Sequence, residues 1–137
     1  TLLASSAASD VYKRQIQDPA NHLKMKTAAD LSLHSSALSG KIKTAVTHYH
    51  TLFTSQDWSL VTLKLDTGRT HQIRVHMKYI GCPLPGDFLY HPVFDRISRQ
   101  ALHSFQLEFC HPITKKTLRF LAPVPEDFQK AFAEKSL

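Results

Sequence analysis

Apolar and polar residues alternate along residues 42–54, as they do in a half-buried β-strand. Ala45 and Thr47 fall on one face of this stretch, and His48 and His50 fall on the other. β-branched and aromatic residues dominate, which favours a strand over a helix. The pattern therefore predicts a β-strand with a distinct inner and outer face.

Residues 58–65 alternate in the same way, after a short Ser-Gln-Asp turn signal at residues 55–57. Two alternating runs joined by so short a connection are typical of an antiparallel hairpin. We expect the two strands to pair directly.

The hydrophobic period changes in the next segment. Ile73, Met77 and Ile80 are spaced i, i+4, i+7, which predicts a helix with these residues on its buried face. Thr70 is the expected N-cap. Gly81, with a proline two positions later, is the expected stop.

The remainder of the chain predicts two more strands and a short helix. A proline-containing loop at 82–100 leads to strands over about 101–110 and 118–122, and Pro125 opens a helix with acidic residues in its first turn. The order strand, strand, helix, loop, strand, strand, helix predicts an α+β fold. We expect a mixed, mainly antiparallel sheet with flanking helices.

The beginning of the chain shows neither the hydrophobic period of a strand nor that of a helix. Residues 1–15 resemble translated adapter sequence, so we exclude them from the fold and expect the domain to span residues 16–137. Residues 16–40 are polar and interrupted by Pro and Gly, which predicts a loop.

Within that loop, His22, Lys24 and Lys26 occur in a stretch that has no acidic residue between Pro19 and Ala29. These side chains can contact a phosphate backbone.

Composition narrows the class of partner. The chain has 137 residues, of which 42% are hydrophobic and 20% charged, so we expect one soluble domain with a core. The net charge of +6 favours a polyanionic partner, with nucleic acid first. No apolar run is long enough to span a membrane. Cys82 and Cys110 are too few for a disulfide framework, so we expect free thiols in the cytoplasm.

The segment Thr67–Met77, "TGRTHQIRVHM", gathers two arginines and two histidines, and no acidic residue occurs from Thr67 to Gly86. Arg74 lies beside the predicted buried stripe of the helix. An arginine in that place needs a carboxylate or phosphate partner.

A metal site built on His48 and His50 is an alternative, because both imidazoles lie on one face of a strand. No Cys or carboxylate joins them at the spacing of metal ligands. We therefore expect no metal, and dispersed hydrogen-bonded histidines instead.

Longer motifs connect these segments. "LDTGRTHQIRVHMKYIGCPLPGD" resembles the "TGRTHQIR[VA]H" block and "G.P..GD..Y" tail of the RluA-type RNA pseudouridine synthases. "RQALHSFQLEFCHP" resembles the family's "R.ALHA..L.F.HP", and "LRFLAPVPEDF" resembles its closing "F.AP.P.DF". The resemblance extends over residues 16–137.

The resemblance implies an isomerase that converts uridine to pseudouridine in ribosomal or transfer RNA without a cofactor, after flipping the base from the stack. It assigns Arg74 to pairing with the catalytic aspartate and Leu102 to the uracil pocket. It assigns four further residues to RNA contact or support of the site: Arg69, Thr70, His71 and Gln72.

The family's "HRLD..TSG" motif, which carries the nucleophilic aspartate, does not occur in this sequence. We therefore expect the chain to be the C-terminal portion of a pseudouridine synthase catalytic domain, inactive by itself and monomeric when complete. The alternative is a noncatalytic basic RNA-binding module.

Overall fold

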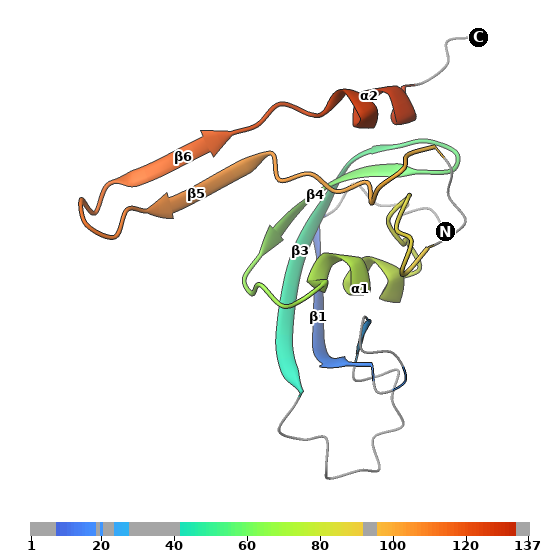
Figure 1. Cartoon of the computed structure of the whole chain (residues 1–137), viewed down its shortest axis with the longest axis horizontal. Coiled ribbons are helices and arrows are strands. Elements are labelled where there is room, and N and C mark those ends of the chain that lie inside the picture. Colours follow the sequence, from blue (N-terminus) through green and yellow to red (C-terminus); the bar gives the residue numbers. More distant parts are fainter. Residues whose placement is uncertain (1–7, 19, 21–23, 28–41, 92–95, 134–137) are drawn as a thin grey trace.

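The computed structural model of the chain describes residues 8–18, 20, 24–27, 42–91 and 96–133. The elements in chain order are β1 (Ala8–Gln17), β2 (Met25–Thr27), β3 (Lys43–Thr54), β4 (Ser59–Leu65), α1 (Gln72–Tyr79), β5 (Gln106–Cys110), β6 (Thr117–Leu121) and α2 (Glu126–Phe132). One sheet has the strand order β2-β1-β3-β4, and β5 with β6 forms a second sheet (Figure 1). The predicted α+β class is confirmed. All pairings between the described strands are antiparallel, so the expected mixed sheet is not found among them.

The predicted hairpin is confirmed by the pairing of β3 with β4. Ala45 and Thr47, which share one face of β3, are 0% exposed. The register shifts between Thr51 and Phe53, near the turn. Alternation thus predicted the strand and its two faces, and the structure shows that the face of Ala45 and Thr47 is the buried one.

The beginning of the chain corrects our expectation. Residues 8–17 form the long strand β1, which pairs with β3 from Ala8 opposite His50 to Gln15 opposite Lys43. Excluding residues 8–15 from the fold was therefore wrong. Among the residues of β1 whose burial is described, Val11 is the one buried apolar residue, and Gln15 contributes a buried amide. A strand whose inner face is polar leaves no hydrophobic period to detect.

The predicted loop at 16–40 is also partly wrong, because Met25–Thr27 forms the edge strand β2 beside β1. Lys24 and Lys26 are described and half-buried. His22 and residues 28–40 lie outside the described residues.

Helix α1 packs on the sheet and contacts β1, β2 and β3 (Figure 1). Its buried residues are Gln72 and the run Arg74–Met77, whereas Ile73 and Ile80 of the predicted stripe are only half-buried. The reason is that the segment carrying the buried residues Asp87 and Tyr90 covers a second side of the helix. A one-sided stripe cannot describe a helix that is covered on two sides.

The predicted end of α1 is confirmed, and its predicted N-cap is wrong. Gly81 has φ +80 and follows the helix, as expected for a stop that needs the left-handed region. Thr70 is not the N-cap. That position is held by His71, at φ 53 and ψ 22, without a side-chain capping bond. Histidine is among the non-glycine residues that adopt this conformation more readily.

The last two strands form a hairpin that extends away from the main sheet (Figure 1). Strand β5 begins at Gln106 instead of residue 101, because Ala101 donates a backbone hydrogen bond to Pro85 O and so follows the preceding loop. Strand β6 lies close to the predicted 118–122. Helix α2 follows Pro125, which is its N-cap instead of its first helical residue.

No helix in the described ranges has the length and apolar character needed to cross a bilayer.

Candidate active site

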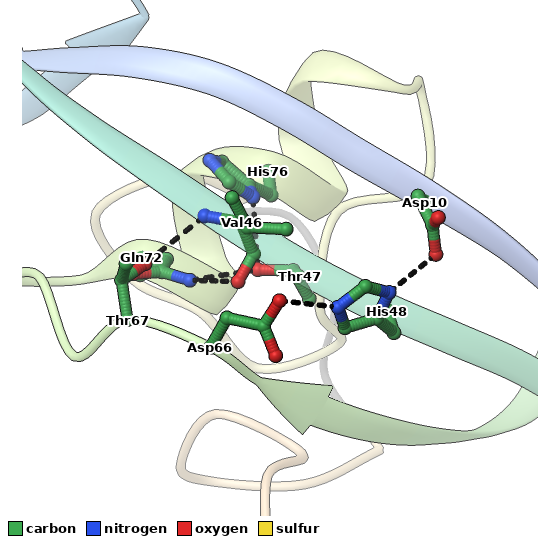
Figure 2. Close-up of polar contacts among 8 residues, drawn as sticks. All are labelled: Asp10, Val46, Thr47, His48, Asp66, Thr67, Gln72 and His76. Carbon is green, nitrogen blue, oxygen red and sulfur yellow. Dashed lines mark hydrogen bonds and ion pairs between the residues drawn. The ribbon is translucent and has the colours of Figure 1, made fainter.

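The loop between β4 and α1 is tied to β3 by the side chain of Gln72. Its Nε2 donates to Val46 O at 2.8 Å and to Thr47 Oγ1 at 3.0 Å (Figure 2). Its Oε1 accepts from Thr67 Oγ1 at 2.7 Å and from Arg69 N at 3.0 Å. Gln72 is 3% exposed, so these four bonds satisfy a buried amide completely.

This network fixes the direction in which α1 leaves the sheet. Thr67 Oγ1 also accepts the Val46 N–H at 3.0 Å, so the loop and β3 are bonded in both directions. His76, one turn along α1, shares the Thr47 hydroxyl through Nδ1 at 2.9 Å (Figure 2). Arg74 lies on α1 between these two anchored residues, Gln72 and His76.

Arg74 forms a side-on, two-bond ion pair with Asp87. Nε donates to Oδ2 at 2.8 Å and Nη2 donates to Oδ1 at 2.6 Å. The side chains of Arg74 and Asp87 are 9% and 0% exposed. Removing these charges from water is favourable only because the planar fork matches the carboxylate and both charges are paired.

Asp87 has little capacity left for any other partner. Besides the two bonds from Arg74, Oδ1 accepts the N–H groups of Leu89 at 3.1 Å and Tyr90 at 3.2 Å. Burial by itself would raise the pKa of Asp87, but the bonds from Arg74 and from these N–H groups outweigh it and hold the pKa below its usual value. Asp87 is an ionised anchor, and its oxygens are not free to attack a substrate.

Gly86 makes this anchor possible. It has φ +68, and an added Cβ would lie 2.2 Å from Arg99 O and 2.7 Å from Ile97 O. The segment from Ile97 onward therefore lies directly against the turn that carries Asp87. A side chain at residue 86 would push the two backbones apart.

One nitrogen of the Arg74 guanidinium, Nη1, is not used in the ion pair with Asp87. Its guanidinium carbon lies 5.0 Å from the ring centroid of Tyr90 and 5.5 Å from that of Phe88, so two aromatic rings flank it. Its bonds to Asp87 use Nε and Nη2. Within the described part of the chain, Nη1 has no hydrogen-bond partner and can donate to a second anion.

A comparison with protein families identifies the family of this chain. The model for RNA pseudouridylate synthases matches residues 7–79, which is more than half of the sequence and includes β1, β3, β4 and α1. The chain belongs to the RNA pseudouridylate synthase family.

This family member resembles curated relatives over part of their length. It is 54% identical over 86 residues to the uncharacterized RNA pseudouridine synthase YjbO of Bacillus subtilis, and the match covers 63% of this chain and 30% of the relative. It is 43% identical over 102 residues to the ribosomal large subunit pseudouridine synthase D of Zymomonas mobilis, covering 68% and 32% of the two chains.

A solved structure shows the same fold. Human RNA Pseudouridylate Synthase Domain Containing 1 superposes with a TM-score of 0.70 at 25% identity, over 90% of this chain and 50% of the human one. The chain thus spans about a third of the length of these two curated relatives and half of the human structure.

The structure shows a partner for Arg74 that the sequence analysis did not assign. We expected its aspartate partner to lie in a motif that the chain lacks, yet Asp87 of the "GD" turn already binds it. The sequence held a signal for this, because Asp87 is the first acidic residue after the acid-free stretch from Thr67 to Gly86. The assignment of Arg74 to a catalytic aspartate stays a prediction, now resting on Nη1.

The other predicted site residues are dispersed around this ion pair. Arg69 is exposed, and its Nε donates to Thr44 O at 3.1 Å. Thr70 is exposed in the turn before α1. Gln72 supports the loop as described above. Leu102 is half-buried, and its carbonyl accepts a hydrogen bond from Arg99 at 3.1 Å.

The two histidines of "TGRTHQIRVHM" do not add positive charge. His71 Nδ1 lies 3.1 Å from Tyr90 Oη, and burial together with the Arg74 charge lowers the pKa of His71. Burial and the charge of Lys13 lower the pKa of His76. Arg74 is therefore the only buried cation among the described residues of this segment.

The alternative of a metal site at His48 gains no support. His48 Nδ1 lies 2.6 Å from Asp10 Oδ1 and Nε2 lies 2.7 Å from Asp66 Oδ2, so both ring nitrogens are engaged (Figure 2). Hydrogen bonds to Asp66 and Asp10 raise the pKa of His48. The described residues contain no group of three or more His, Cys, Asp or Glu that could hold a metal ion.

Proposed function

We propose that this chain supplies the arginine side of the active site of an RNA pseudouridine synthase, an isomerase that converts uridine into pseudouridine within RNA. The observation that carries the proposal is Arg74, a buried guanidinium that Asp87 orients and whose Nη1 remains available. Family membership supports the same reaction.

The chemistry divides between this chain and an aspartate that it does not contain. In the family that the sequence resembles, an aspartate acts on the ribose, the uracil detaches and rotates, and it rejoins through carbon. Asp87 is unsuited to that role because its oxygens are occupied by four hydrogen bonds. Arg74 Nη1 would instead donate to the catalytic carboxylate. That contact keeps the carboxylate ionised and in position.

The finer assignments are part of this proposal. The substrate is ribosomal or transfer RNA, and the names of relatives such as the Zymomonas mobilis enzyme support ribosomal RNA. The target base is flipped from its stack before reaction. The complete enzyme acts as a cytoplasmic monomer, and needs neither metal nor cofactor.

A chimera tests the function. The matching segment of the Zymomonas mobilis ribosomal large subunit pseudouridine synthase D is replaced by that of this chain, and pseudouridine in large-subunit ribosomal RNA is measured in cells that lack their own enzyme. We expect the chimera to restore pseudouridine. Arg74→Gln in the chimera should lower the rate at least about 100-fold, since it removes a charge that acts in the transition state.

The matched control is Arg96→Gln, an exposed arginine paired with Asp57 on the surface, which should leave the rate within about twofold. A folded chimera that forms no pseudouridine, or one in which Arg74→Gln equals Arg96→Gln, would contradict the proposal. Retained RNA binding without pseudouridine would favour the noncatalytic RNA-binding module.

A further inference from the structure

A cavity of about 320 Å³ lies between α1 and the segment that joins β1 to β2. Its wall includes Lys24 and Lys26 from one side and Lys78 and Tyr79 of α1 from the other, together with Asp18 and Tyr90. This volume is in the range of pockets that bind small ligands or parts of larger ones.

The charges in this cavity do not balance. Asp18 is its one acidic residue, and Oδ2 lies 3.3 Å from Lys26 Nζ while Oδ1 accepts the Ala20 N–H at 3.0 Å. Neither Lys24 nor Lys78 forms an ion pair with any described residue. The three lysines that line the cavity thus share one carboxylate, that of Asp18, which interacts electrostatically with Lys26 and Lys24.

The cavity shares a wall with the Arg74 site. Tyr90 Oη accepts the Met25 N–H at 2.8 Å, which fixes the ring between the two sites. The ring lies 5.0 Å from the Arg74 guanidinium carbon, and Lys78 Nζ lies 5.8 Å from the same ring centroid. Lys78 follows Arg74 by one helical turn, so both cations project from neighbouring positions of α1.

We propose that this cavity binds a backbone phosphate of the RNA substrate, beside the nucleotide held at Arg74. The inference rests on the proposed function for its choice of RNA. Lysine ammonium groups bind phosphates as point charges, and phosphate contacts position a nucleic acid without reading its sequence. Tyr90 does not repel an anion there, because burial raises the pKa of its phenol.

The test uses the whole 137-residue chain and a fluorescent single-stranded RNA containing uridine, with affinity measured by anisotropy over a series of salt concentrations. The variant is Lys24→Gln with Lys78→Gln, which leaves the Lys26–Asp18 pair intact. Each lost phosphate contact on a single strand lowers the slope of log K against log salt by about 0.7. Because the cavity binds one phosphate, we expect a fall of about 0.7 in the magnitude of the slope and an affinity about tenfold weaker at low salt.

The matched control is Lys64→Gln with Lys116→Gln, two exposed lysines outside the cavity that remove the same charge. We expect it to change the slope by much less. Lys24→Arg with Lys78→Arg should restore binding, and circular dichroism should show that all three variants fold. Equal losses in the cavity and control variants would mean that only net charge matters and would overturn the proposal.

Inorganic phosphate and uridine monophosphate, titrated at equal ionic strength, separate RNA from small anions. We expect neither to displace the RNA more than potassium chloride does. If either anion displaces the RNA from the unmodified chain but not from Lys24→Gln with Lys78→Gln, the cavity is a small-anion site and the RNA assignment is overturned. The RNA assignment is also overturned if the unmodified chain does not bind RNA. If the chimera still forms pseudouridine when any of these results is obtained, the cavity proposal is overturned and the proposed function is not.

Discussion

Arg74 and Asp87, thirteen residues apart, join through two hydrogen bonds in a place where their side chains are 9% and 0% exposed. Arg99 and Asp127 form the same Nε and Nη2 pair at 2.8 and 2.9 Å, but their side chains are 38% and 47% exposed. The chain thus contains the same arginine–aspartate geometry once in a buried place and once at the surface. The two pairs differ mainly in burial, so a difference in their contribution to stability is due to burial.

Asp87→Ala should lower the free energy of unfolding by about 3–5 kcal/mol, because it leaves the Arg74 charge buried without a partner. Asp127→Ala, the matched control, should cost about 1 kcal/mol or less, because water replaces the lost contact. Urea unfolding measures both. Similar losses for the two variants would show that Arg74 is not dependent on Asp87.

Gln72→Ala should destabilise the chain by about 2–3 kcal/mol, since it leaves Val46 O and Arg69 N without their buried partner. Hydrogen exchange at the Arg69 amide should accelerate as the loop loosens. The control is Gln106→Ala, which removes one exposed bond to Arg119 and should cost less than about 0.5 kcal/mol. An unchanged exchange rate at Arg69 would argue against this role of Gln72.

His76 should make the fold sensitive to acid. Its pKa is lowered by burial and by Lys13, so near pH 6.5 the unfolded chain takes up the proton more readily than the folded one. Stability is therefore lost as pH falls below about 6.5. In urea titrations at pH 7.5 and 5, His76→Met should reduce that loss.

His48 provides a control of opposite sign for this pH effect. Its pKa is raised by Asp66 and Asp10, so its contribution is present below the unfolded pKa and is lost as pH rises through the folded one. His48→Gln should therefore steepen the loss of stability in acid, while His76→Met flattens it. The same pH profile in both variants would contradict these assignments.

The β5–β6 hairpin should drive self-association. Leu107 and Phe120 pair across the strands and are 55% and 54% exposed. Exposed apolar side chains on a strand pair promote association. Sedimentation should show oligomers at tens of micromolar, reduced by Leu107→Ser with Phe120→Ser. The control is Leu52→Ser with Leu65→Ser, at exposed positions on the other sheet, which should reduce the oligomers less. An equal reduction in the two variants would contradict a specific role of the hairpin in association.

The purified 137-residue chain should form no pseudouridine in RNA by itself. Arg74 has its orienting anchor, but Asp87 is fully buried and already accepts four hydrogen bonds, so we expect that it cannot replace a nucleophilic carboxylate. The assay is quantification of pseudouridine in RNA after incubation with the chain, with the chimera as the positive control. Any conversion above background that disappears in Arg74→Gln would contradict the prediction.

Features whose cause is local could be predicted from the sequence. The β3–β4 hairpin followed from alternation, the end of α1 followed from Gly81, and the class of fold followed from the order of elements. It could also be predicted that Arg74 needs an anion. Each of these depends on a repeat or on the chemistry of one residue, which a linear pattern displays.

The anion that Arg74 binds and the sides of α1 that are buried could not be predicted in this way. Asp87 reaches Arg74 because Gly86 takes a positive φ against the Arg99 backbone, a contact that no periodicity encodes. Strand β1 was missed for the same kind of reason: its buried positions include Gln15, and its partner β3 lies far along the chain. A buried polar group such as the Asp87 carboxylate is satisfied by a partner distant in sequence, so its place is known only when the chain is folded.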